Sequence, residues 1–286
     1  MGRPRRLRRL DLGEGDRRDH RPDGGRRGGV HRDVPFVEAG TVRLHVQSLG
    51  TGTPPVLMIH GLLVGSLATW LFTAGRRLAQ SRRVVLYDLR GHGLSERPPT
   101  GYDLETQRRD LEALRTALNL TGPIDLVGHS YGALVALAAA LDDPRSVRRL
   151  VLVEAPLPPS RAGEVTGFLG RTPQEMIAAL PEAQRERVTK GGRRARRLLA
   201  SLQALATGTS LLSDLAAEAD FDDARVRRLD RPVRLVYGRR SGCLGAAERL
   251  RSALPQAELV LLDGGHFLPV EAPEALSAAV AGFLDG

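Results

Sequence analysis

The chain has 286 residues, a formal net charge of +9 and one cysteine, Cys243. This length suits one α/β domain with an insertion, and no apolar run approaches the ~20 residues that a membrane span requires. A single cysteine excludes an internal disulfide, and the charged N-terminus lacks the apolar stretch of a signal peptide. We therefore predict a cytoplasmic protein without membrane association, either a monomer or a homodimer.

Residues 1–33 are polar and glycine-rich, and their eleven arginines outnumber six acidic residues. Lys190 is the only lysine in the chain, so almost all basic residues are arginine, a bias that GC-rich coding produces. A basic tail can bind nucleic acid through phosphate contacts. This one lacks aromatic residues for stacking and includes acidic residues, so we predict a disordered extension and no nucleic-acid partner.

From residue 34 onward, short apolar strands alternate with helices. Phe36–Glu38 and Val42–Gln47 predict a hairpin with Gly40 in its turn. Later apolar runs without polar alternation predict buried strands, so the sheet is expected to be parallel and covered on both faces by helices. These strands are expected at 56–59, 84–88, 124–127, 151–154, 233–237 and 258–262, and the helices at 66–80, 104–119, 131–141, 246–254 and from 273.

The alternation stops between Pro156 and Arg228, where only helical stretches such as Thr172–Ala179 and Arg193–Ala206 occur. We predict an α/β core at 34–155 and 229–286 and a helical insertion at 156–228. Within the insertion, Arg185–Arg197 carries seven basic residues and one acidic residue. This segment is either a solvated helix face or a docking patch for an acidic partner, such as a carrier-protein-bound acyl donor.

The most informative motif is Gly128-His129-Ser130-Tyr131-Gly132. It follows an apolar strand and precedes an alanine-rich helix, which places Ser130 at the apex of a sharp turn. Glycines flank the serine because such a turn leaves no space for neighbouring side chains. Backbone amides of Tyr131 and of Leu62, after the strand that ends in His60-Gly61, are the predicted donors to an oxyanion.

Further motifs follow in a recognisable order: His60-Gly61, then Asp88-x-Arg90-Gly91-His92-Gly93-x-Ser95, the Ser130 motif and finally Gly265-His266-Phe267. From about Val34 to its end, the chain resembles the α/β-hydrolases. The resemblance implies a mostly parallel eight-stranded sheet with helices on both faces and a helical cap inserted after strand 6. It also implies a catalytic Ser130–His266 pair.

The third member of a catalytic triad is an acid, and here the chain departs from the common family pattern. Most relatives end the strand that corresponds to Val233–Tyr237 in Gly-x-x-Asp, but this chain has Ser241 at the position of that carboxylate. Glu154, at the end of the preceding strand, is the predicted replacement, because adjacent parallel strands end at the same edge of the sheet. Ser241 is then expected to have no partner in the site, and Asp263 to cap the loop before His266. Two alternatives stay open: Glu154 caps the junction with the insertion, or no acid functions.

The remaining histidines are expected to brace turns. His60 and His92 lie in glycine-containing turns, and His129 precedes the serine. No cluster of His, Cys, Asp and Glu shows metal-ligand spacing, and no phosphate-binding or dinucleotide-binding glycine loop is present. We predict neither a metal nor a cofactor.

Ser130 narrows the range of possible reactions, because relatives that open epoxides or displace halide have aspartate at this position. Serine with histidine suits attack on a carbonyl and an acyl-enzyme intermediate. We predict hydrolysis of an ester or thioester of a small organic acid. The alternatives are a tailoring enzyme of natural-product biosynthesis, as a carboxylate-eliminating lyase or an acyltransferase, and a C–C bond hydrolase. A non-catalytic binding protein would not need both Ser130 and His266.

Overall fold

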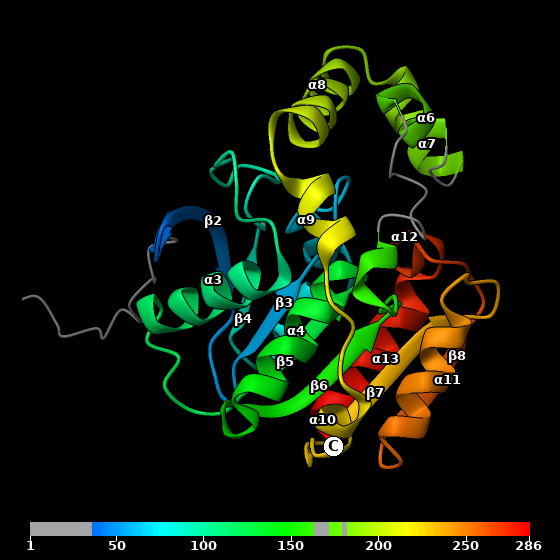
Figure 1. The fold of residues 1–286 in the computed structure, drawn as a ribbon. Coiled ribbons are helices and arrows are strands. Elements are labelled where there is room, and N and C mark those ends of the chain that lie inside the picture. Colours follow the sequence, from blue (N-terminus) through cyan, green and yellow to red (C-terminus); the bar gives the residue numbers. More distant parts are fainter. Residues whose placement is uncertain (1–35, 163–171, 179–181) are drawn as a thin grey trace, which may run out of the picture. The chain divides into compact units, whose positions relative to one another are not determined.

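The computed structural model describes residues 36–162, 172–178 and 182–286, so the predicted extension 1–33 lies outside the described residues. Within them, eight strands form one sheet in the order β1-β2-β4-β3-β5-β6-β7-β8 (Figure 1). β1 and β2 pair antiparallel with their neighbours, and all other pairs are parallel. The strands are β1 (Phe36–Ala39), β2 (Val42–Leu49), β3 (Val56–Ile59), β4 (Val84–Tyr87), β5 (Ile124–His129), β6 (Val147–Val153), β7 (Val233–Gly238) and β8 (Glu258–Leu262). The mostly parallel eight-stranded sheet is thereby confirmed.

Helices cover both faces of this sheet, because successive strand side chains point to opposite sides. In β3, Leu57 and Ile59 belong to one buried cluster, whereas Val56 and Met58 belong to the other. All four side chains are completely buried. The first cluster includes residues of α3 (Leu104–Ala117), α4 (Tyr131–Asp142) and α11 (Leu244–Ala253), and the second includes residues of α1 (Ala68–Trp70), α2 (Arg76–Leu78) and α13 (Pro273–Asp285).

One predicted helix is interrupted. The sequence predicts a continuous helix from Ser66 to Gln80, but a π-helical turn, η1 (Leu71–Gly75), separates α1 from α2. Thr73 within this turn has non-helical dihedral angles, φ −118° and ψ −105°, and its hydroxyl donates to the Thr69 carbonyl at 2.8 Å. Such π-turns occur frequently at functional sites, and residues of this one line the cavity described below.

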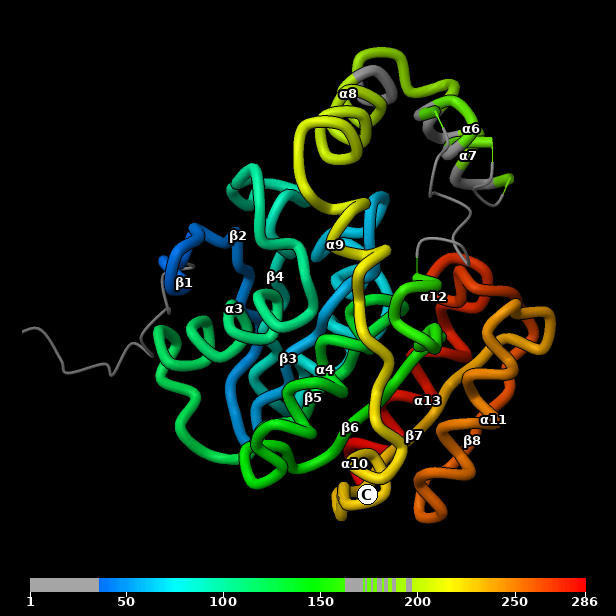
Figure 2. The backbone as a smooth tube through the Cα atoms, in the orientation of Figure 1, coloured from blue at the N-terminus to red at the C-terminus, as the bar shows by residue number. Residues whose placement is uncertain are grey.

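Only helices lie between β6 and β7 in the described part of the insertion. They are η3 (Pro159–Arg161), α6 (Pro173–Ala178), α7 (Glu182–Lys190), α8 (Arg193–Gly208), α9 (Leu211–Ala217) and α10 (Asp223–Arg227). After α9 the chain returns along the core to α10 (Figure 2). There Val226 and Leu229 are buried, and Arg249 of α11 pairs with Asp223. The last part of the predicted insertion therefore packs on the core, and the division into domains stays a prediction.

Among the described helices, none has both the length and the apolar character that a membrane span needs. The short elements that remain are η2 (Pro144–Ser146), which precedes β6, and α12 (Leu268–Glu271), which follows His266.

Candidate active site

Ser130 occupies a strained turn between β5 and α4. Its φ of 55° and ψ of −123° are rare for a residue with a side chain, and this strain is stored where chemistry needs a fixed hydroxyl. The glycines permit the turn. A Cβ atom on Gly132 would lie 2.4 Å from the His60 carbonyl oxygen, and one on Gly128 would lie 2.2 Å from the Gly132 carbonyl oxygen. The Ser130 amide donates to the Val153 carbonyl at 2.8 Å, which fixes the turn to β6.

Three sequence-predicted residues meet at the carboxyl ends of the parallel strands. Ser130 Oγ lies 2.9 Å from His266 Nε2, and His266 Nδ1 lies 3.1 Å from Glu154 Oε2. The three side chains are buried. These contacts give the imidazole a hydroxyl on one nitrogen and a carboxylate on the other, the arrangement that general-base activation of a serine requires.

Glu154 has a fixed position at the end of β6. Its side chain is completely buried, and its backbone has a φ of 56°. The Gly238 amide donates to Glu154 Oε1 at 2.5 Å, and the Ser241 hydroxyl donates to Glu154 Oε2. The expectation that Ser241 has no partner in the site is wrong. β6 and β7 pair in parallel, so the residues that follow both strands meet at one edge, and Ser241 reaches the carboxylate there.

The expected role of Asp263 is also wrong. Its side chain is exposed and pairs with Arg240. The loop around His266 is instead held by Glu271, whose carboxylate accepts from the Gly265 amide at 2.7 Å and from the Phe267 amide at 3.2 Å. Glu271 belongs to α12, a short helix that the sequence pattern does not predict.

The predicted oxyanion donors lie beside a pair of buried histidines. In the part of the chain that the structure describes, neither the Leu62 amide nor the Tyr131 amide donates to a protein group. The next amide, that of Leu63, donates to His92 Nε2 at 2.8 Å, and the Leu89 amide donates to His60 Nε2 at 3.0 Å. Accepting nitrogens identify both rings as neutral.

Burial explains why these rings stay neutral. It lowers the pKa of His60, and it lowers the pKa of His92 to about 3, with a contribution from the neighbouring His60 ring. Burial likewise lowers the pKa of His129 to about 3, and His129 Nε2 lies 2.9 Å from the His266 carbonyl oxygen. The prediction that these histidines brace turns is confirmed.

A cavity of about 470 Å³ opens onto Ser130 and His266. Among its described lining residues, histidine is the only side chain with an ionisable group. The polar groups are otherwise hydroxyls, and Phe72 is largely exposed to solvent. The lining residues are Gly61, Leu62, Val64, Gly65, Ser66, Ala68, Thr69, Phe72, Thr73, His129, Ser130, His266, Phe267, Pro269, Val270 and Pro273. This cavity suits a neutral group with moderate polarity.

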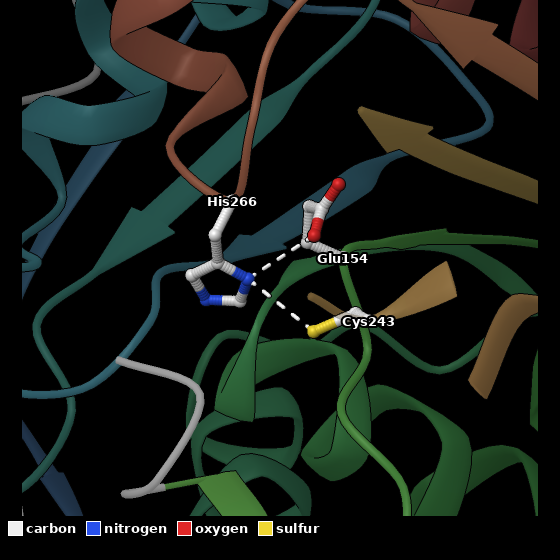
Figure 3. A group of neighbouring side chains, drawn as sticks. All are labelled: Glu154, Cys243 and His266. Atoms are coloured by element: carbon white, nitrogen blue, oxygen red, sulfur yellow. Dashed lines mark hydrogen bonds and ion pairs between the residues drawn. The ribbon is translucent and has the colours of Figure 1, made fainter. Parts of the chain in front are cut away.

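Cys243 lies on the Glu154 side of His266 (Figure 3). Its Sγ is 3.5 Å from His266 Nδ1, and its amide donates to Ser241 Oγ at 3.0 Å. Burial, with the nearby Glu154 charge, raises the pKa of the thiol to about 12. The sequence showed no cluster of metal-ligating residues, but Glu154, Cys243 and His266 form one, with one ligand atom from each within 4.8 Å of the others. Glu154 and His266 are 112 residues apart, so no short motif reveals this cluster.

Comparison with known proteins agrees with the fold. The family described as alpha/beta hydrolase fold matches residues 54–273. A 2-(acetamidomethylene)succinate hydrolase of Mesorhizobium japonicum is 29% identical over 87% of this chain and 94% of its own length. A 2-hydroxy-6-oxo-2,4-heptadienoate hydrolase of Pseudomonas putida is 37% identical over 42% of this chain and 44% of its own. A solved thermophilic esterase from Thermogutta terrifontis is 26% identical, with a TM-score of 0.70 over 88% of this chain and 97% of that one.

The family match spans more than half of the chain, and the strand order and serine turn agree with it. The chain belongs to the α/β-hydrolase fold family, and its relatives place it among the hydrolases.

Proposed function

We propose that the protein is a serine hydrolase that cleaves a carboxylic ester or thioester through Ser130, His266 and Glu154. The observation that carries the proposal is the chain of contacts from Ser130 Oγ through the His266 ring to the Glu154 carboxylate, at 2.9 and 3.1 Å. His266 Nε2 accepts the Ser130 proton as the hydroxyl attacks the carbonyl, and Glu154 stabilises the imidazolium that forms.

The oxyanion of the tetrahedral intermediate would bind the Leu62 and Tyr131 amides. The Tyr131 amide is at the N-terminus of α4, where unpaired N–H groups and the helix dipole favour negative charge. The Leu62 amide follows β3 on a loop that neutral His92 holds through the Leu63 amide. Collapse of the intermediate expels the alcohol or thiol, which takes the proton from His266. Water then attacks the acyl-enzyme as His266 accepts a proton from it, and His266 passes this proton to the leaving serine oxygen.

The cavity supports an acyl or alcohol group without charge. No Lys or Arg is among its described lining residues, so a substrate carboxylate would find no ion-pair partner there. In this respect the site differs from what a succinate-derived substrate, such as that named for the Mesorhizobium relative, would require. We therefore favour uncharged esters and thioesters of small organic acids.

Hydrolysis of a C–C bond is the second candidate, favoured by the similarity to the Pseudomonas enzyme, whose name describes an oxo-dienoate and no ester. The same Ser130–His266 pair serves either reaction. A carboxylate-eliminating or acyl-transferring tailoring reaction would also use these residues.

Replacement of the nucleophile tests the proposal. Ser130→Ala is expected to abolish turnover of p-nitrophenyl esters and labelling by a fluorophosphonate, because the attacking oxygen is lost. The melting temperature should be retained, since the alanine side chain fits the same turn. Near wild-type turnover by Ser130→Ala would contradict an acyl-enzyme. A wild-type protein that takes up the label but cleaves only vinylogous 1,5-diketones would establish the C–C alternative.

A further inference from the structure

Cys243 has no step in the proposed hydrolysis, yet its sulfur is 3.5 Å from the ring nitrogen that Glu154 also contacts. Cys243 is the only cysteine in the chain. The carboxylate, the thiol and the imidazole come from three different segments, which follow β6, β7 and β8 respectively. Figure 3 shows the three side chains converging around His266 Nδ1.

We propose that Glu154, Cys243 and His266 form a binding site for Zn²⁺, and that the bound ion inhibits the hydrolase. Sulfur, imidazole nitrogen and carboxylate oxygen are the ligand types that zinc takes, and three protein ligands leave a fourth position for water. The inhibitory effect rests on the proposed function, whereas the binding of the ion does not.

Two of the three separations between ligand atoms agree with a tetrahedral ion. Zinc–sulfur and zinc–nitrogen bonds of about 2.3 and 2.05 Å at a tetrahedral angle separate the two ligand atoms by about 3.6 Å, and the nitrogen–oxygen separation is about 3.3 Å. The observed separations are 3.5 Å between Cys243 Sγ and His266 Nδ1 and 3.1 Å between His266 Nδ1 and Glu154 Oε2. The third separation, between Cys243 Sγ and the Glu154 carboxylate, lies within 4.8 Å, whereas a tetrahedral ion needs about 3.6 Å there, so a side-chain rotation of Cys243 or Glu154 completes the site.

The charges also balance. The carboxylate of Glu154 and the thiolate of Cys243 neutralise the two positive charges of the ion, which offsets the cost of holding charge in a buried place. Binding releases the thiol proton of Cys243 to solvent. The Ser241 hydroxyl keeps its hydrogen bond to Glu154 and supports the ligand from outside, as second partners of metal ligands do.

Inhibition follows from a change in which nitrogen of the His266 ring carries the proton. Hydrolysis requires Nδ1 to carry the proton, so that Nε2 is free to accept the proton of Ser130. An ion on Nδ1 leaves the ring proton on Nε2, and this nitrogen then donates to Ser130 Oγ. The serine is no longer activated, although the substrate cavity stays open.

The test uses Zn²⁺ and Co²⁺ chlorides with the full-length protein, and Mg²⁺ as an oxygen-preferring control. We expect one Zn²⁺ per chain by isothermal titration, inhibition that a chelator reverses, no effect of Mg²⁺, and a thiolate-to-cobalt charge-transfer band. Because the chain has one cysteine, this band can come only from Cys243. Cys243→Ala should lose the band and raise the inhibition constant for Zn²⁺ at least about 100-fold, relative to its own rate without metal.

Cys243→Val, which better fills the buried space, provides a second variant if alanine lowers the melting temperature. Absence of the cobalt band in the wild type, or equal zinc inhibition of wild type and Cys243 variants, would overturn the site. A band without inhibition would retain the metal site and contradict the role of His266 in the proposed hydrolysis, so the two failures are distinguishable.

Discussion

The edge of the sheet that carries Ser130, Glu154 and His266 contrasts with helices α6 to α8 of the insertion. At the sheet edge every predicted catalytic side chain is buried and hydrogen bonded to another element. In α6 to α8, the described side chains are mostly exposed, and Ile177, Leu202 and Leu205 are the buried apolar ones among them.

We expect the two regions to have different roles, because their side chains differ in burial. The core holds its reacting groups by short contacts between adjacent strands, so chemistry depends on individual hydrogen bonds there. The insertion presents a charged surface, and its contacts with the core include Arg97, which donates to Ser201 at 2.6 Å. Changes in the insertion should therefore alter which substrates arrive, and changes at the sheet edge should alter how fast they react.

The largest effect is expected at the acid. Glu154→Gln keeps the shape of the side chain but removes the charge that stabilises protonated His266, and such a loss can lower turnover by as much as ~10⁴. Steady-state kinetics on a p-nitrophenyl ester measure it. If the variant keeps more than about a tenth of the wild-type kcat, a barrier change of only ~1.4 kcal/mol, Glu154 is not the triad acid.

Acid should destabilise the folded core. His60, His92 and His129 are neutral when folded, with lowered pKa values, and about 3 for the last two. The unfolded chain takes up their protons near pH 6.5, so His92 and His129 each lower the free energy of unfolding by about 1.4 kcal/mol per pH unit between there and their folded-state pKa of about 3, and His60 acts in the same direction. Urea unfolding between pH 7.5 and 4.5 measures the slope, and His129→Gln should reduce it. The predicted insertion contains no histidine. A flat profile over this range would contradict the neutral, buried assignment.

A smaller effect is expected at Ser241. Ser241→Ala removes the hydroxyl that donates to Glu154 Oε2 and accepts from the Cys243 amide. We expect a fall in kcat of roughly tenfold, or ~1.4 kcal/mol, with KM nearly unchanged, because a positioning residue acts only through the carboxylate. Ser241→Thr keeps a hydroxyl and should restore most of the rate. If Ser241→Ala turns over substrate at the wild-type rate, Ser241 does not position Glu154 for catalysis.

The double replacement Glu154→Gln with Ser241→Asp tests whether a carboxylate after β7 can replace Glu154. It places a carboxylate after β7, the commoner position in the family. Partial recovery of kcat over Glu154→Gln alone is expected, because β6 and β7 end at the same edge of the sheet and the loop after β7 already brings Cys243 to His266. No recovery would mean that the loop after β7 holds its carboxylate out of reach of His266.

The smallest effect is expected in the insertion. The described basic side chains of Arg185, Lys190, Arg193 and Arg197 are exposed, as a docking patch would require. Arg193→Glu with Arg197→Glu should lower kcat/KM a few-fold for a carrier-protein-bound acyl substrate and leave a small neutral ester unaffected, because exposed charge acts on encounter. Added salt should have the same selective effect. Arg251→Glu, an exposed charge reversal on α11 in the core, serves as the control. Equal responses for both substrates would remove the docking proposal.

Much of the fold could be predicted because its signals are local. Short apolar strands without alternating polar residues predict a buried parallel sheet, and the glycines around Ser130 predict the turn. The boundaries of α3 and α4 were predicted to within two residues. The prediction of a continuous helix from Ser66 is wrong at η1. There the Thr73 hydroxyl donates to the Thr69 carbonyl, and no local sequence preference predicts a π-turn.

The sequence by itself predicted an α/β-hydrolase sheet, because apolar strands and turn residues are local signals, and the resemblance to that family predicted the pairing of Ser130 with His266. Only the tertiary structure decided how the acid is held. Gly238, Ser241 and Cys243 reach Glu154 and His266 because β6, β7 and β8 end side by side. Contacts between residues so far apart in the chain leave no periodicity or motif, and the parallel register of the strands alone brings them together.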